Sequence, residues 1–82
     1  MNYGILFERI SEPGIPSDQW YAHVPSLGLT THGQGIEGAR QAAHDLVTLW
    51  ITEKRANGES VAQPGEFFFS TLDLSGDAIQ SA

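Results

Sequence analysis

The three histidines are the side chains of this sequence best suited to bind a metal ion or transfer a proton. A zinc site needs three or four converging ligands, often supplied by a short motif, and His23, His32 and His44 form no such motif. The chain contains no cysteine, which excludes thiolate zinc sites and disulfides. We therefore interpret the histidines as surface residues and expect neither a metal ion nor a cofactor.

A glycine motif at residues 33–38, Gly-Gln-Gly-Ile-Glu-Gly, matches the G-x-G-x-x-G fingerprint of dinucleotide sites. That fingerprint works inside a βαβ unit, where the helix N-terminus attracts a phosphate group. Here strands of an antiparallel type precede the motif, and Glu37 puts a negative charge where the phosphate would bind. We therefore assign the glycines to a turn and to the start of a helix. No G-x-S-x-G nucleophile motif occurs in the chain.

Carboxylates offer one further enzymatic hypothesis, because two-metal nucleases use clusters of acidic side chains. Glu8, Asp73 and either Glu37 or Asp45 are the residues that such a cluster would need. The predicted helix turns Asp45 toward solvent, and the predicted first strand turns Glu8 away from its apolar face. These carboxylates do not converge, so we interpret them as a charged surface and predict that the protein is not an enzyme.

The length of the chain indicates the number of domains, and its net charge indicates which kind of molecule it can bind. The 82 residues are enough for one domain, and the net charge is −6, with ten acidic and four basic side chains. This balance disfavours nucleic acid and favours a basic protein partner. The chain shows no signal peptide and no apolar stretch of about 20 residues, so we expect a cytoplasmic protein that does not enter a membrane. Because so small a domain lacks disulfides, we also expect a dimer or higher homo-oligomer.

The elements that position these side chains begin with three strands. Residues 3–10 carry apolar side chains at a period of two, and a second strand covers residues 19–24. Between them lies a segment rich in proline and turn-forming residues. Pro25 closes the second strand, and a short turn leads to a third strand at residues 29–32. Three consecutive strands with short links predict an antiparallel meander.

From Ile36 the apolar period changes to about 3.6, which predicts an amphipathic helix that reaches Arg55. Asn57 and Gly58 supply a left-handed stop. Ala42 and Leu49 lie at the margin of the apolar stripe and widen it. The sequence leaves two interpretations of these positions open, namely ordinary core packing and contact with a second subunit.

A fourth strand is predicted at residues 66–74, which include three consecutive phenylalanines. Alternation gives this strand apolar side chains on both faces, so Phe68 joins Ala42 and Leu49 as a candidate oligomer contact. The expected fold is α+β with the order β-β-β-α-β, an antiparallel sheet carrying one long amphipathic helix on one face. Residues 1–74 form the single domain, and residues 75–82 form a short polar tail.

The segment Trp-Tyr-Ala-His-Val-Pro-Ser-Leu-Gly at residues 20–28, together with the glycine and alanine-rich helix that follow, resembles the HicB antitoxin family. That family combines an aromatic-x-Ala-x-x-Pro-Asp-Leu strand, two glycines, a helix and a Gly-x-x-x-Pro-x-Pro connection. The resemblance covers about residues 1–74 and rests on packing and turn residues. The matching positions are Tyr21, Ala22, Val24, Pro25, Leu27, Gly28, Gly33, Ala39, Ala43, Trp50 and Pro64.

Several positions depart from the family pattern. Ser26 replaces the aspartate after the proline, Leu29 replaces a frequent cysteine, and Gly35 stands where a threonine usually caps the helix. Glycine supplies no capping oxygen. Many members also carry a DNA-binding segment after this domain, and the residues after 74 are too few for one, so we do not expect operator binding.

The resemblance implies a fold similar to a partial ribonuclease-H-like domain without ribonuclease chemistry. It also implies self-association and sequestration of a small basic ribonuclease toxin of the HicA type, for which an acidic surface is suited. The alternative is a stand-alone homo-oligomeric domain that has no toxin and binds another protein or a small ligand. A discrete complex with such a toxin would favour the first hypothesis.

Overall fold

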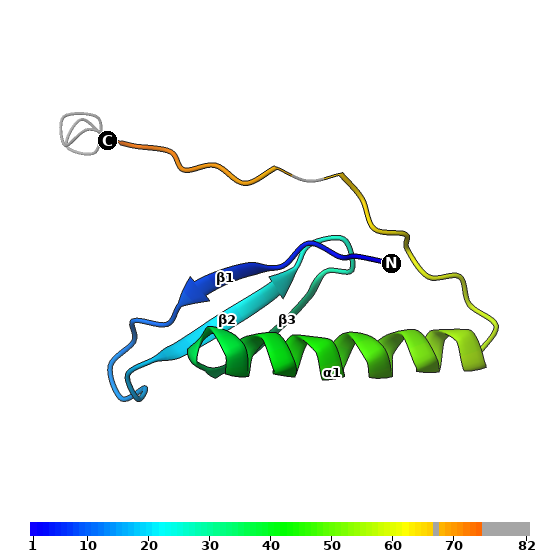
Figure 1. The fold of residues 1–82 in the computed structure, drawn as a ribbon, viewed down its shortest axis with the longest axis horizontal. Helices are drawn as coiled ribbons and strands as arrows, with labels where there is room; N and C mark the ends of the chain where they lie inside the picture. The colour runs from blue at the N-terminus through cyan, green and yellow to red at the C-terminus, as the bar shows by residue number, and fades with distance from the viewer. Residues whose placement is uncertain (67, 75–82) are drawn as a thin grey trace.

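The protein is an α+β domain in which a three-stranded antiparallel sheet is followed by one long helix. A computed structural model describes residues 1–66 and 68–74. The strands are β1 (Leu6–Arg9), β2 (Gln19–Val24) and β3 (Leu29–Gln34), and the helix is α1 (Gly35–Ala56). The sheet order is β1-β2-β3, and α1 packs on one face of it (Figure 1). The predicted meander and helix are confirmed.

The strand register decides which side chains face the helix. Ala22 of β2 lies opposite Phe7 of β1 and Thr31 of β3, while the adjacent Tyr21 lies opposite Glu8 and His32. Because successive side chains point to opposite faces, the first set lies on the helix side and the second on the opposite side. Ala22 is fully buried, which agrees with this placement.

The fully buried core is small and consists of Ala22, Val24, Ala39 and Ala43. Larger side chains surround it, and they are only partly buried: Tyr3, Ile5, Phe7, Trp20, Leu27, Leu29 and Val47. Alanine at the crossing of helix and sheet lets the two backbones approach closely. The consequence is a thin core that depends on surrounding aromatic and branched side chains.

Helix and sheet approach each other closely where two glycines meet, Gly33 and Gly38. A Cβ atom built on Gly33 would lie 2.5 Å from the carbonyl carbon of Gly38 and 2.7 Å from the backbone nitrogen of Ala39. Gly35 has a backbone φ of +67°, a value that residues with a side chain rarely adopt. The glycine motif therefore serves a sharp strand-to-helix junction and a backbone contact, as its interpretation as turn and helix start required.

Several element boundaries differ from their prediction. β3 continues to Gln34, and α1 begins at Gly35 with Gln34 as its N-cap, so the cap is not Gly35. The reason is a contact that the sequence did not reveal, a hydrogen bond of 2.7 Å donated by the Gly35 N–H to the carbonyl of Asp18. This bond ties the helix start to the loop before β2. β1 is also shorter than the predicted span of residues 3–10.

The predicted helix stop is confirmed in detail. Asn57 is the C-cap, and Gly58 follows with a φ of +72°. The N–H of Glu59 donates to the carbonyl of Lys54 at 2.9 Å, and that of Gly58 donates to Arg55 at 3.1 Å. This pair of bonds is the Schellman arrangement, which satisfies the last carbonyls of a helix.

The predicted fourth strand is absent from the part of the segment that the structure describes, residues 66 and 68–74. Two hydrogen bonds hold the preceding connection, from the Tyr3 hydroxyl to the Ala62 carbonyl at 2.7 Å and from the Gly65 N–H to Ser26 Oγ at 3.3 Å. Beyond Gly65 the chain runs along the outer side of β1 but apart from it (Figure 1), and none of its described residues pairs with a strand. We call residues 66 and 68–74 the apolar arm. Phe67 and the predicted tail lie outside the described residues.

Candidate functional site: the open face of the sheet

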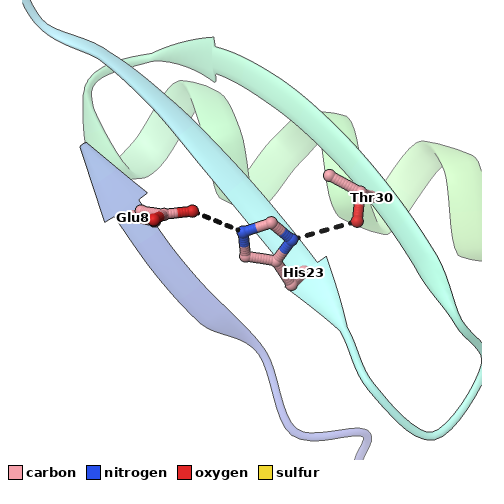
Figure 2. A network of polar contacts seen from close by, with 3 residues as sticks. All are labelled: Glu8, His23 and Thr30. Carbon is pink, nitrogen blue, oxygen red and sulfur yellow. Dashed lines mark hydrogen bonds and ion pairs between the residues drawn. The ribbon is translucent and has the colours of Figure 1, made fainter. Parts of the chain in front are cut away.

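The sheet face opposite α1 carries polar and aromatic side chains from all three strands that could recognise another molecule. We call it the open face. Figure 2 shows it from the front, with the helix behind the sheet. By register and alternation, its side chains are those of Leu6, Glu8, Gln19, Tyr21, His23, Thr30, His32 and Gln34. Most of them are polar or aromatic, as expected for a surface that contacts other proteins.

His23 lies at the centre of a three-residue network that spans all three strands (Figure 2). Its Nε2 lies 3.0 Å from Oε1 of Glu8, and its Nδ1 lies 3.0 Å from Oγ1 of Thr30. A neutral ring satisfies both contacts when Nε2–H donates to the carboxylate and Nδ1 accepts from the threonine hydroxyl. The His23 side chain is 28% exposed and that of Glu8 is 64% exposed, so solvent reaches both groups. The network fixes the His23 side chain on the sheet.

The same three groups have the connectivity of a nucleophile, a base and a carboxylate. Acyl transfer also requires a cleft that positions the substrate and donors that stabilise an oxyanion. Glu8, His23 and Thr30 line neither the hollow beside the network nor the hollow on the helix side of the sheet, both described below. We therefore interpret the network as a recognition element on an exposed surface.

A hollow of about 410 Å³ lies beside this network on the open face. We call it the open-face hollow. The loop between β1 and β2 forms one wall, where Gly14 has a φ of +84° and the Ile15 N–H donates to the Glu12 carbonyl at 3.2 Å. Ile15 is 42% exposed. The lining residues are Ile10, Glu12, Ile15, Pro16, Gln19, Tyr21 and His32.

Permanent charge on this side of the sheet is negative. Glu8 belongs to the open face, and Glu12 lines the hollow. Three of the four basic side chains cover aromatic rings elsewhere, namely Arg9 over Trp20 at 5.9 Å, Arg40 over Phe7 at 5.3 Å and Lys54 over Trp50 at 5.3 Å. Arg55, the fourth, lies in the last turn of α1. An apolar hollow with carboxylates at its margin suits the aliphatic stem and charged head of a lysine or arginine.

A second hollow lies on the helix side of the sheet, beside β1. We call it the helix-side groove. Its volume is about 400 Å³, and its lining comes from the chain before β1, from β2 and from one side of α1. The lining residues are Met1, Asn2, Tyr3, Ile5, Val24, Ala43, His44, Val47, Thr48 and Ile51. The groove exists because α1 packs mainly over β2 and β3.

The residues that carry the family resemblance lie mostly in the core and the turns. Ala22 and Ala39 are fully buried, and Leu27 packs against the core. Pro25, Leu27 and Gly28 form the β2–β3 turn, where the Gly28 N–H donates to the Pro25 carbonyl at 3.2 Å and Gly28 has a φ of +66°.

The remaining motif residues lie apart from one another. Tyr21 reaches the open-face hollow, Gly33 contacts the helix backbone, Trp50 lies under Lys54, and Pro64 belongs to the connection before the apolar arm. The structure does not gather these residues into one site.

The candidate oligomer contacts also lie apart. Ala42 is partly buried, Leu49 is 57% exposed on α1, and Phe68 is 90% exposed on the apolar arm. The sequence did not identify the Glu8–His23–Thr30 network or the two hollows. Alternation already placed Glu8 and His23 away from the core, but their contact depends on a cross-strand register that the sequence does not specify.

Within residues 1–66 and 68–74, no group of three or more histidine, aspartate or glutamate side chains is placed to hold a metal ion. No helix in this part of the chain is long and apolar enough to cross a membrane. Comparisons with models of known protein families, with curated proteins and with solved structures find no match.

Proposed function

We propose that this chain is a non-catalytic, antitoxin-like module that binds a small basic protein through the open face of its sheet. The observation that carries the proposal is the apolar open-face hollow with Glu8 and Glu12 beside it and the lysine and arginine side chains placed elsewhere. The sequence resemblance to HicB antitoxins suggests a ribonuclease toxin of the HicA type as the partner. In that role the domain would mask the basic, RNA-binding surface of the toxin.

Electrostatics supports a basic partner in two ways. The net charge of −6 attracts a basic protein at long range and speeds its association. At contact, Glu8 and Glu12 would pair with cationic side chains, while Tyr21 and Ile15 would cover their aliphatic stems. Tyrosine is enriched among residues that dominate binding energy, so Tyr21 is the expected anchor of the interface.

The β-β-β-α-β architecture is part of this proposal. Within the described residues the β-β-β-α core lacks only the last strand of this order, and the apolar arm has the composition to supply it at a free edge of the sheet. The second candidate function, a stand-alone homo-oligomer without a toxin, is favoured by the exposure of the arm.

The direct test is the solution mass of the protein, measured by light scattering alone and after mixing with a HicA-type toxin. We expect a discrete complex that weakens as salt is raised, because exposed charge pairs are screened. The double variant Glu8→Gln with Glu12→Gln should bind at least about tenfold more weakly. The matched control is Glu53→Gln on the exposed side of α1, which should bind normally. Absence of a complex, or equal weakening by the control, would refute the proposal.

A further inference from the structure

We infer that pH regulates the binding of a basic protein to the open face, because protonated His23 competes with the cationic side chains of the partner for Glu8 and Tyr21. The same surface carries the proposed function, on which this inference rests. Binding should be strong at about pH 7.5, where histidine side chains are ordinarily neutral, and weak at about pH 5.5, where they are ordinarily charged.

His23 lies beside the two groups of the open face that are best placed to receive a cation. Its Nε2 is 3.0 Å from the Glu8 carboxylate, and its ring centroid is 5.6 Å from that of Tyr21. Carboxylates and aromatic rings are the groups that bind an ammonium or guanidinium ion on a protein surface. A positive charge on His23 would therefore interact with both groups from inside the molecule, and the cation of a partner would find them occupied.

Thr30 allows the His23 ring to gain a proton without moving (Figure 2). In the neutral ring, Nδ1 accepts a hydrogen bond from the Thr30 hydroxyl at 3.0 Å. In the protonated ring, Nδ1–H donates to the same oxygen, and the hydroxyl proton turns toward solvent. Both contacts of the ring are kept, while the contact with Glu8 becomes an ion pair. Protonation therefore changes the charge of the open face and leaves its shape the same.

His32 extends the effect to the open-face hollow. It lies opposite Tyr21 in the pairing of β2 with β3, and it lines the hollow together with Glu12. The His32 side chain is exposed, so it exchanges protons with solvent. A positive charge on His32 would repel a lysine or arginine side chain that enters the hollow.

Few other charged groups face the two histidines. The α1 helix packs on the opposite side of the sheet, and Arg9 lies over Trp20. The titratable groups of the surrounding strands and loop are Glu8, Glu12 and Tyr21. Between about pH 7.5 and about pH 5.5, histidines gain a proton while carboxylates stay charged and tyrosine stays neutral. The formal charge of this surface therefore changes from negative to neutral, and the attraction for a basic partner is lost.

The size of the effect follows from thermodynamic linkage. Because protons and the partner compete for the same surface, each weakens the binding of the other by the same factor. Coupling between two sites is commonly about 5-fold to 150-fold, and two histidines beside two carboxylates should give at least about tenfold. Binding of the partner should also release protons at a pH where the histidines are partly charged.

The test is the dissociation constant of the complex with a HicA-type toxin, measured by calorimetry at one ionic strength. We expect binding at least about tenfold weaker at about pH 5.5 than at about pH 7.5. In the double variant His23→Gln with His32→Gln, this ratio should fall below about twofold whatever the affinity at the higher pH, because glutamine gains no proton. Titration of the toxin itself affects both proteins equally, so their difference isolates these two histidines.

The matched control is His44→Gln, which removes the third histidine of the chain. His44 lies on α1 with its side chain 72% exposed, and it lines the helix-side groove on the opposite side of the sheet. This variant should keep the pH ratio of the wild type. The circular dichroism spectrum of the free wild-type protein should be the same at both pH values, because the His23 ring keeps its hydrogen bonds.

The outcomes separate this inference from the proposed function. A complex whose pH ratio is the same in the wild type and in the double variant, or is lost in His44→Gln, would overturn the inference and leave the proposed function intact. Loss of helix at the lower pH would overturn it as well, because unfolding would then explain the release. Absence of a complex at both pH values would refute the proposed function and the inference together. Proton release, measured as heat that depends on the buffer, should occur in the wild type and be smaller in the double variant, and equal release would contradict the competition.

Discussion

Replacing Gly33 with alanine tests the claim that a backbone contact between β3 and α1 organises this fold. The new Cβ atom would lie 2.5 Å from both the carbonyl carbon and the carbonyl oxygen of Gly38. Ordinary contacts between such atoms are about 3.5–4.0 Å, so helix and strand must separate by about 1 Å. Backbone atoms on both sides leave no flexible side chain that could move instead.

The magnitude follows from the size of the core. Separating α1 from β3 loosens Ala39 against Ala22, and both are among the few fully buried residues. Overpacking of this kind costs about 1–3 kcal/mol, and we expect the upper part of that range. For a domain of this length, 1 kcal/mol corresponds to about 4–8 °C in Tm. We therefore expect Gly33→Ala to lower Tm by about 10 °C or more.

The matched control is the glycine on the other side of the same contact. A Cβ atom on Gly38 would meet its nearest neighbour, the carbonyl carbon of Gly33, at 3.6 Å, which is an ordinary contact. Because Gly38 lies inside α1, alanine there should stabilise the helix by up to about 1 kcal/mol. Thermal unfolding followed by circular dichroism at one protein concentration measures both variants. Equal stability of Gly33→Ala and the wild type would refute the close backbone packing.

Three further substitutions test separate parts of the fold. Val24→Ala removes buried methyl groups from a side chain that is 1% exposed, and urea unfolding should show a loss of about 2 kcal/mol. Gly58→Ala forces a side chain into a φ of +72° at the helix stop, and the same assay should show a loss of about 1 kcal/mol; an unchanged midpoint would contradict the Schellman arrangement. Tyr3→Phe removes the hydrogen bond to Ala62, so amide exchange of residues 62, 63, 65 and 66 should quicken while the exchange of α1 stays the same.

The sequence was sufficient for the elements whose pattern is local. The apolar period of α1 and the Asn57–Gly58 stop predicted a helix that ends where it was expected. The strands were found because alternation and turn residues mark them, although β1 is shorter and β3 longer than predicted. These boundaries depend on contacts between distant residues, such as the bond from Gly35 to Asp18.

The candidate site was harder to predict, because it too depends on contacts between residues that are distant in the sequence. Alternation placed Glu8 and His23 on one face, but only the pairing of β1 with β2 brings them within 3.0 Å. The hollow beside Tyr21 depends on how the loop around Ile15 folds over the sheet, which no periodicity encodes. The fourth strand was predicted from composition alone, and composition indicates that a segment can pair without indicating where its partner lies.

The stacking of Arg9 on Trp20 and of Lys54 on Trp50 provides the protein with two natural fluorescent probes. Trp20 also donates its indole N–H to Asp18 at 3.3 Å, so its emission reports on the junction of the β1–β2 loop with the helix start. Trp50 reports on the last turns of α1, at the other end of the molecule. Single-tryptophan variants would therefore show, without any label, whether the two ends of this thin domain melt together or in sequence.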